Sequence, residues 1–233
     1  MAVTMPIPEG FEALIRTGAW AAVLVGVLTT TWLLVMLLDR KPGGGTRAEL
    51  EAIGAAGWRQ IPRFLPTTLV AFCYVPVWLA LAVLLWQEEP SLALPAASFG
   101  LLYVPVTAFG YWLQYTVTRA LAETAADDPA GARAGNEVIG FHEPRTSVPG
   151  AAVVLGYTLW SLGASCAGAG LVRSCGPEAV TTGALLLVTA GLMLLGAVGV
   201  VIRNRVLELG VLLSGVVSLA ATISASVLLF GTG

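Results

Sequence analysis

Residues Ala179 to Ile202 read AVTTGALLLVTAGLMLLGAVGVVI, a run that contains no charged side chain. A helix rises about 1.5 Å per residue, so about 20 such residues cross the hydrocarbon core of a bilayer, which is roughly 30 Å thick. The run lacks the alternation of polar and apolar residues that is typical of a membrane β-strand. Lipid cannot satisfy backbone polar groups, so the stretch predicts a transmembrane α-helix.

Blocks of similar length and composition occur on both sides of this stretch. Of all residues, 57% are hydrophobic and 11% charged, whereas soluble domains carry about 25% charged residues. The mean hydropathy of +0.83 also indicates lipid as the solvent. The sequence therefore predicts an all-α, integral membrane bundle of about six transmembrane helices in a single polytopic domain, 1–233. The other predicted spans are Ala19 to Leu38, Pro66 to Trp86, Leu94 to Val117, Pro149 to Val172, and Val206 to Phe230.

The basic residues predict how the bundle is oriented. The chain has 12 Lys and Arg residues, and only Arg16 and Arg173 lie outside the first, third and fifth connections. Connections rich in Lys and Arg stay in the cytoplasm, so both termini are expected outside the cytoplasm. Lys41 is the one lysine among these residues, a bias that points to a GC-rich prokaryotic genome. We therefore expect a multi-pass protein of a prokaryotic cell membrane.

Two of the predicted cytoplasmic connections are long. Thr46 and Glu49 form a capping-box pattern that starts a helix, and the residues that follow predict a short interfacial helix over 46–61 on the membrane surface. It either returns the chain to the bilayer or offers a surface to a partner. Residues 119–147 contain too few large apolar side chains to form a core, so this segment is predicted to be a cytoplasmic loop.

A short phrase is repeated in the second and third spans, as Tyr74-Val-Pro-Val and Tyr103-Val-Pro-Val. Its prolines remove a backbone hydrogen bond near the middle of each helix and predict kinks. If the two spans pair as an antiparallel hairpin, the kinks lie at similar depth. Either the two helices satisfy each other's freed carbonyls, or they open a binding cavity near the membrane midplane. The candidate cavity residues are Tyr74, Tyr103, Thr107, Tyr111 and Gln114.

The sixth span carries the most regular pattern in the chain, a stripe of hydroxyl residues spaced four apart. These are Ser214, Ser218, Thr222 and Ser226. Hydroxyls at this spacing share one helix face, where they serve close helix packing or line a passage for a small solute. Glycines in the fourth and fifth spans, such as Gly168 and Gly196, give a similar signal for close packing.

The reactive side chains are few. Glu208 lies about one turn inside the sixth span and is predicted to be an interfacial acid, with a proton or ion site as the alternative. Cys166 and Cys175 lie toward the outer side, where a disulfide persists if the loop folds back. With three Cys and one His in the chain, we expect neither a metal nor another cofactor. A net charge of −2 predicts no nucleic-acid partner.

The sequence narrows the function mainly by exclusion. It has no P-loop, Rossmann, HExxH or GxSxG pattern, which makes a membrane enzyme the least favoured class. Our first hypothesis is a non-catalytic membrane subunit or scaffold. Such a protein would pack in membrane lipid with other membrane chains, or with copies of itself, through its glycine and serine stripes. The alternative is a channel or transporter for a small neutral solute.

Overall fold

The computed structural model describes residues 9–38, 61–124, 127–131, 134, 147–174 and 176–232, and it describes only the backbone at 36–38, 61–64, 114–115 and 118–119. The described chain is all-helical, and each of its six long helices contains a stretch apolar and long enough to cross a membrane. This confirms a multi-pass helical bundle. The helices are α1 (Glu12–Leu38), α3 (Ile61–Trp86), α4 (Pro90–Thr124), α6 (Val148–Arg173), α7 (Pro177–Ile202) and α8 (Arg205–Thr232).

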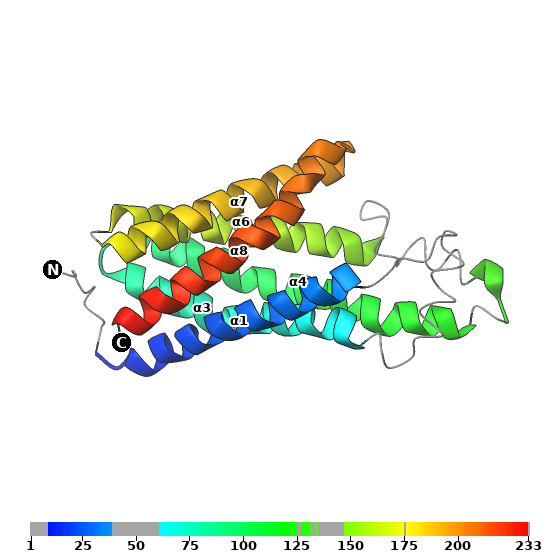
Figure 1. Cartoon of the computed structure of the whole chain (residues 1–233), viewed down its shortest axis with the longest axis horizontal. Helices are drawn as coiled ribbons and strands as arrows, with labels where there is room; N and C mark the ends of the chain where they lie inside the picture. Colours follow the sequence, from blue (N-terminus) through cyan, green and yellow to red (C-terminus); the bar gives the residue numbers. More distant parts are fainter. Residues whose placement is uncertain are drawn as a thin grey trace.

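The helices form a closed ring in chain order. Each long helix packs against the next one along the chain, and α8 returns to pack against α1 (Figure 1). The contact between α1 and α8 is the smallest of these neighbouring contacts, and α3 also touches α6 across the ring. Short connections join helices as antiparallel neighbours, which explains the pairing of α3 with α4, of α6 with α7 and of α7 with α8.

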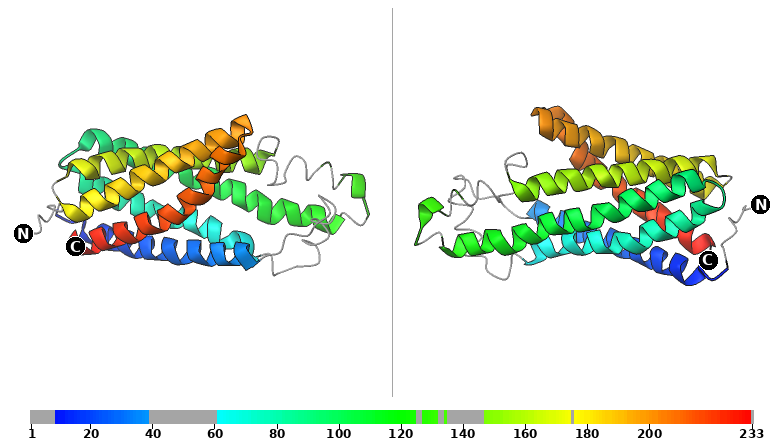
Figure 2. Two further views of the ribbon diagram at one scale, coloured as in Figure 1. Left: turned by 45° about the horizontal axis from the view of Figure 1, so that its top comes forward. Right: turned by 180° about the vertical axis from the view of Figure 1, so that it is seen from behind.

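One helix of the ring is inclined to the others. The end of α8 lies near the beginning of α1, whereas the beginning of α8 lies far from the end of α1 (Figure 1). Both further views show the same divergence, and the end of α7 accompanies α8 (Figure 2). The seam between α1 and α8 therefore widens toward the end of the bundle where α8 begins.

The turn between α7 and α8 explains why this pair stays together. Arg203 adopts a left-handed backbone conformation with φ of 63°, which ends α7. The Asn204 side chain then accepts a hydrogen bond of 3.0 Å from the backbone N–H of Val206, as an N-cap residue does. α7 thus ends and α8 begins within one tight turn.

Glycines set the spacing of the later helices. A Cβ atom on Gly168 of α6 would lie 2.8 Å from the carbonyl oxygen of Gly183 of α7. A Cβ on Gly196 of α7 would overlap the Val211 backbone of α8. Because only glycine permits such close approach, these positions fix the α6–α7 and α7–α8 contacts. The predicted small-residue stripes are thus largely used for packing inside the chain.

Two predicted features of the connections need separate comment. α4 continues to Thr124, so the part of 119–147 that precedes residue 125 is helix rather than loop. Ala120, Leu121 and Glu123 are strong helix formers, which explains why the helix extends beyond its apolar block. The predicted interfacial helix over 46–61 lies outside the described residues, apart from Ile61 where α3 begins.

Candidate binding cavity

A cavity of about 580 Å³ lies inside the ring, and every long helix contributes to its wall. It lies off-centre, in the half of the bundle where α1, α4 and α7 end and α3, α6 and α8 begin. Its volume is within the range of small-molecule sites, about 300–1,000 Å³. The lining residues are Thr29, Trp32, Leu33, Thr67, Val70, Tyr74, Tyr103, Tyr111, Tyr157, Trp160, Met193, Glu208, Val211, Leu212, Ser214, Gly215 and Ser218.

The repeated phrase of the second and third spans meets at this cavity. The rings of Tyr74 and Tyr103 make an edge-on contact with their centroids 5.8 Å apart. α3 and α4 therefore meet the condition for the cavity hypothesis, an antiparallel pairing with the two phrases at similar depth. Both helices continue through their central prolines, Pro76 and Pro105.

Aromatic rings close one end of the cavity. Trp160 lies with its centroid 6.0 Å from that of Tyr74 and 5.9 Å from that of Trp78. Beyond these rings lies a second cavity of about 10 Å³, lined in part by Tyr74, Trp160 and Thr222. A space of that size is close to the minimum for one water molecule. Tyr74 and Trp160 line both cavities and stand between them.

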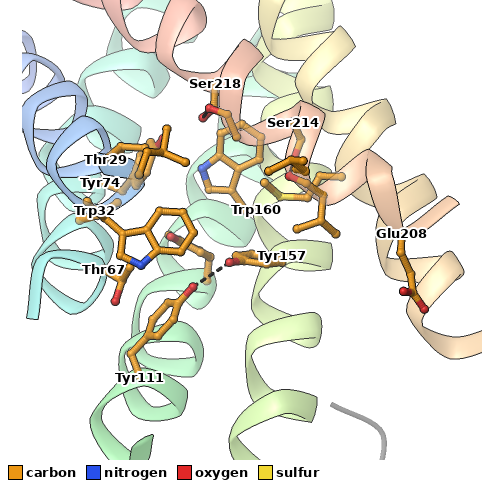
Figure 3. A pocket seen from close by; sticks show the side chains of 17 residues that line it. Thr29, Trp32, Thr67, Tyr74, Tyr111, Tyr157, Trp160, Glu208, Ser214 and Ser218 are labelled. Carbon is orange, nitrogen blue, oxygen red and sulfur yellow. Dashed lines mark hydrogen bonds between the residues drawn. The ribbon is translucent and has the colours of Figure 1, made fainter. Parts of the chain in front are cut away.

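The tyrosine hydroxyls provide the polar part of the wall on the α4 and α6 side. The hydroxyls of Tyr111 and Tyr157 are joined by a hydrogen bond of 2.7 Å (Figure 3). Tyr103 is only 5% exposed, yet no other residue in the described part of the chain hydrogen-bonds to its hydroxyl. A buried hydroxyl without a partner costs roughly 1–3 kcal/mol, and buried tyrosines ordinarily find one. Tyr103 is therefore available to a molecule in the cavity.

The α8 side of the wall has a different hydrogen-bonding character. Ser214 donates its hydroxyl proton to the Val211 carbonyl at 2.7 Å, and Ser218 donates to the Gly215 carbonyl at 2.8 Å. Such bonds within the helix are common for serine in membrane helices. Ser214 is fully buried, whereas Ser218 is half-buried and lines the cavity. Because its proton is used within α8, Ser218 presents oxygen lone pairs toward the cavity and acts as an acceptor there.

The predicted hydroxyl stripe divides along α8. Ser214 and Ser218 line the main cavity and Thr222 lines the small one, whereas Ser226 is buried and donates to the Ile223 carbonyl. The hydrogen bond between hydroxyl groups of α7 and α8 involves Ser224, which lies beside the stripe on α8. Ser224 lies 2.8 Å from Thr182, oxygen to oxygen.

Glu208 lies at the edge of the cavity, in the first turn of α8. Its carboxylate is separated from the tyrosine hydroxyls (Figure 3). A negative charge is favoured at the beginning of a helix, where the macrodipole is positive. Its position agrees with an acid near the end of the membrane span, and among the described residues that line the cavity it is the single charged one.

Three predicted site residues are placed elsewhere or not described. Thr107 is fully buried, and a Cβ on Gly156 of α6 would overlap its hydroxyl oxygen. It therefore belongs to the α4–α6 contact, because the absence of a side chain at Gly156 lets the two helices approach there. The side chain of Gln114 and the whole of Cys175 lie outside the described residues. The disulfide between Cys166 and Cys175 therefore stays a prediction.

Several cavity residues were not predicted as site residues from the sequence. They are chiefly Trp32, Thr67, Tyr157 and Trp160. Tyr157 and Trp160 lie one turn apart on α6, so a search for aromatic pairs at helical spacing would have found them. Nothing in the local sequence of α1 distinguishes Trp32 from Trp20, which is 66% exposed.

No family model, curated protein or solved structure matches this chain. The chemistry of the site must therefore be inferred from its own residues. Among the described residues there is no group of three His, Cys, Asp or Glu side chains that could hold a metal ion. The cavity instead offers aromatic surface, a free tyrosine hydroxyl and serine oxygens, a combination suited to an uncharged molecule with one polar group.

Proposed function

We propose that the chain is a non-catalytic membrane protein that binds and carries a small neutral molecule in the cavity between its helices. The observation that carries this proposal is the convergence of Tyr103, Tyr157 and Ser218 on one cavity. These residues come from three different helices. A site of convergent polar groups in a mostly apolar wall is the usual form of a small-molecule site.

The packing of the small residues favours this carrier function over a scaffold. The scaffold hypothesis assigned the glycine and serine stripes to contacts with other chains. Gly168, Gly183 and Gly196 are instead occupied by neighbouring helices of the same chain. Co-purification with other membrane proteins in mild detergent would still favour a subunit, whereas a carrier should run alone or as copies of itself.

The proposal also includes the orientation and the membrane. We place the cavity in the cytoplasmic half of a prokaryotic cell membrane, with both termini outside. The basis is that Arg203 and Arg205 lie at the end of the bundle nearest the cavity, and positive residues favour the cytoplasmic side. A carrier oriented in this way would be open toward the inner leaflet.

Photolabelling of the detergent-purified protein with a short, water-soluble diazirine alcohol tests the proposal. We expect saturable labelling on the peptides that carry Tyr157, Trp160 and Ser214. Gly215→Phe is the test variant, because Gly215 lines the cavity and a Cβ there meets no atom within 4 Å. The added Cβ displaces no neighbour, and we expect the ring to occupy part of the cavity; a loss of about 1.4 kcal/mol in binding would lower labelling about tenfold.

The matched control is Gly191→Phe on α7. A Cβ at Gly191 also meets nothing within 4 Å, but Gly191 is exposed and does not line the cavity. This variant should label as the parent protein does. Labelling that cannot be saturated, or that is equal in both variants, would contradict binding in the cavity.

A further inference from the structure

We infer that the natural ligand is an uncharged lipid alcohol that enters the cavity sideways from the bilayer, between α1 and α8. This inference rests on the proposed function and adds the chemical class of the ligand and its route. It follows from where the wall of the cavity is thinnest and from the hydrogen-bonding groups that the wall leaves unused.

The route follows from the seam between α1 and α8. These helices share the smallest contact in the ring, and they diverge toward the cavity end of the bundle (Figure 2). Thr29 and Trp32 of α1 and Gly215 of α8 line the cavity, and all three are half-buried. Leu212 of α8 also lines the cavity, yet 61% of it is exposed. The wall between α1 and α8 is therefore thin, because a residue that lines the cavity is also exposed on the outside of the bundle.

The surface next to this seam is suited to lipid. Leu209 and Val216, one turn or less from Leu212 on α8, are 54% and 59% exposed. They belong to a helix that is long and apolar enough to cross the membrane. In a bilayer, such a surface is in contact with acyl chains. A molecule dissolved in the bilayer would therefore reach the seam without passing through water.

The polar groups of the wall define the head of the ligand. Tyr103 has a hydroxyl proton to donate, since no described residue hydrogen-bonds to it. Ser218 has used its proton within α8 and offers only lone pairs. A hydroxyl group on the ligand matches both walls, because it accepts one hydrogen bond and donates another. Among the described lining residues, a charged head would have only Glu208, at the edge, as a charged neighbour.

The aromatic rings define the depth of insertion. Tyr74 and Trp160 close the far end of the cavity. An alkyl or isoprenoid tail therefore cannot pass through the bundle along its axis, and it must remain in the seam or in the lipid. This arrangement agrees with a ligand whose head lies among the tyrosines and whose tail extends between α1 and α8.

The test uses vesicles that contain the protein and one of three photoreactive probes. The first is a long-chain diazirine alcohol that stays in the bilayer, the second is its methyl ether, and the third is the short water-soluble alcohol. We expect the long-chain alcohol to label the peptides carrying Trp160 and Ser214. The methyl ether, which cannot donate to the serine oxygens, should label them about fivefold less, as the loss of one hydrogen bond predicts.

Variants of the protein test the head group of the ligand and its place of entry separately. Tyr103→Phe should bring the labelling by the long-chain alcohol down to the level of the ether, while Gly215→Phe should abolish it and Gly191→Phe should leave it unchanged. If the short alcohol labels the cavity and the long-chain alcohol does not, the ligand enters from water and the lateral route is wrong. Equal labelling by alcohol and ether would overturn the assignment of the head group. If no probe labels the cavity, the proposed function itself fails.

Discussion

The size of individual side chains decides how closely the helices of this bundle approach one another. Gly156 accommodates Thr107, and Gly168 accommodates Gly183, at distances where a side chain would overlap. The same close packing leaves the Thr107 hydroxyl oxygen buried, without a hydrogen-bond partner among the described residues. At this position, close packing leaves the hydroxyl with no hydrogen bond to a described residue. We infer that packing contributes more to the free energy of unfolding than the hydrogen bond would.

Removing the Thr107 hydroxyl should therefore not lower the free energy of unfolding. We expect Thr107→Val, which has nearly the same shape, to be neutral or to raise the free energy of unfolding by up to about 1 kcal/mol. Unfolding of the detergent-solubilised protein by sodium dodecyl sulfate would measure the change. A clear destabilisation would mean that the hydroxyl has a partner, such as a buried water.

Adding a side chain at Gly168 should have the opposite effect. Gly168→Val places a Cβ within 2.8 Å of the Gly183 carbonyl oxygen. Such overpacking ordinarily costs about 1–3 kcal/mol. The same unfolding assay should show a loss of this size. Gly191→Val, where the added atoms meet open space, serves as the control, and an equal loss in both variants would refute close α6–α7 packing as the cause.

Between helices, hydroxyl groups contribute less than their number suggests. Ser214, Ser218 and Ser226 each donate to a carbonyl of their own helix. Across the α7–α8 contact, the side-chain hydrogen bond found in the described structure joins Thr182 and Ser224. The pairing of α7 with α8 therefore depends chiefly on Gly196 and its neighbours.

A double-mutant cycle can measure the contribution of that bond. For Thr182→Val and Ser224→Ala we expect a coupling free energy of about 0.6 kcal/mol, the average for hydrogen bonds between membrane helices. The comparison pair is Thr189→Val with Ser226→Ala, since each of these hydroxyls donates within its own helix. The comparison pair should show no coupling. A coupling in that pair as large as in the first would exclude the direct bond as its source.

At the scale of the whole molecule, the inclination of α8 decides where the cavity lies. All six long helices contribute to its wall, but α1 and α8 separate at one end only (Figure 1). A ring of parallel helices would close equally along its length. The asymmetry gives the bundle one half with a cavity and one packed half, and Tyr74 and Trp160 lie between them near the middle of their helices.

The orientation of that asymmetric bundle is testable by cysteine labelling. Ser91 and Thr124 are exposed at opposite ends of α4, so single cysteines there, in a chain with Cys73, Cys166 and Cys175 replaced by Ala, report on the two sides. We expect a membrane-impermeant maleimide to label Ser91→Cys in intact cells and Thr124→Cys only after permeabilisation. The reverse pattern would invert the topology and place the cavity toward the outside.

Much of the fold could be read from local sequence, because lipid imposes a simple requirement on each segment. The block around Ala179 to Ile202 and its five counterparts had to be helices, since only helices and closed barrels satisfy the backbone within a bilayer and these blocks lack the alternation of barrel strands. If the second and third spans paired through their short connection, the two Tyr-Val-Pro-Val phrases had to lie at similar depth, and α3 and α4 do pair in this way.

The composition of the cavity could not be predicted in the same way. Trp32 of α1 and Trp160 of α6 are brought together with Ser214 by packing between helices that are far apart in sequence. Local sequence fixes which face of a helix carries small side chains. Which helix packs against that face depends on how all six helices fit together. The sequence by itself determined that the chain crosses the membrane as a helical bundle. Only the tertiary structure decided that α8 inclines away from α1, and the cavity lies toward the end of the bundle where these two helices diverge.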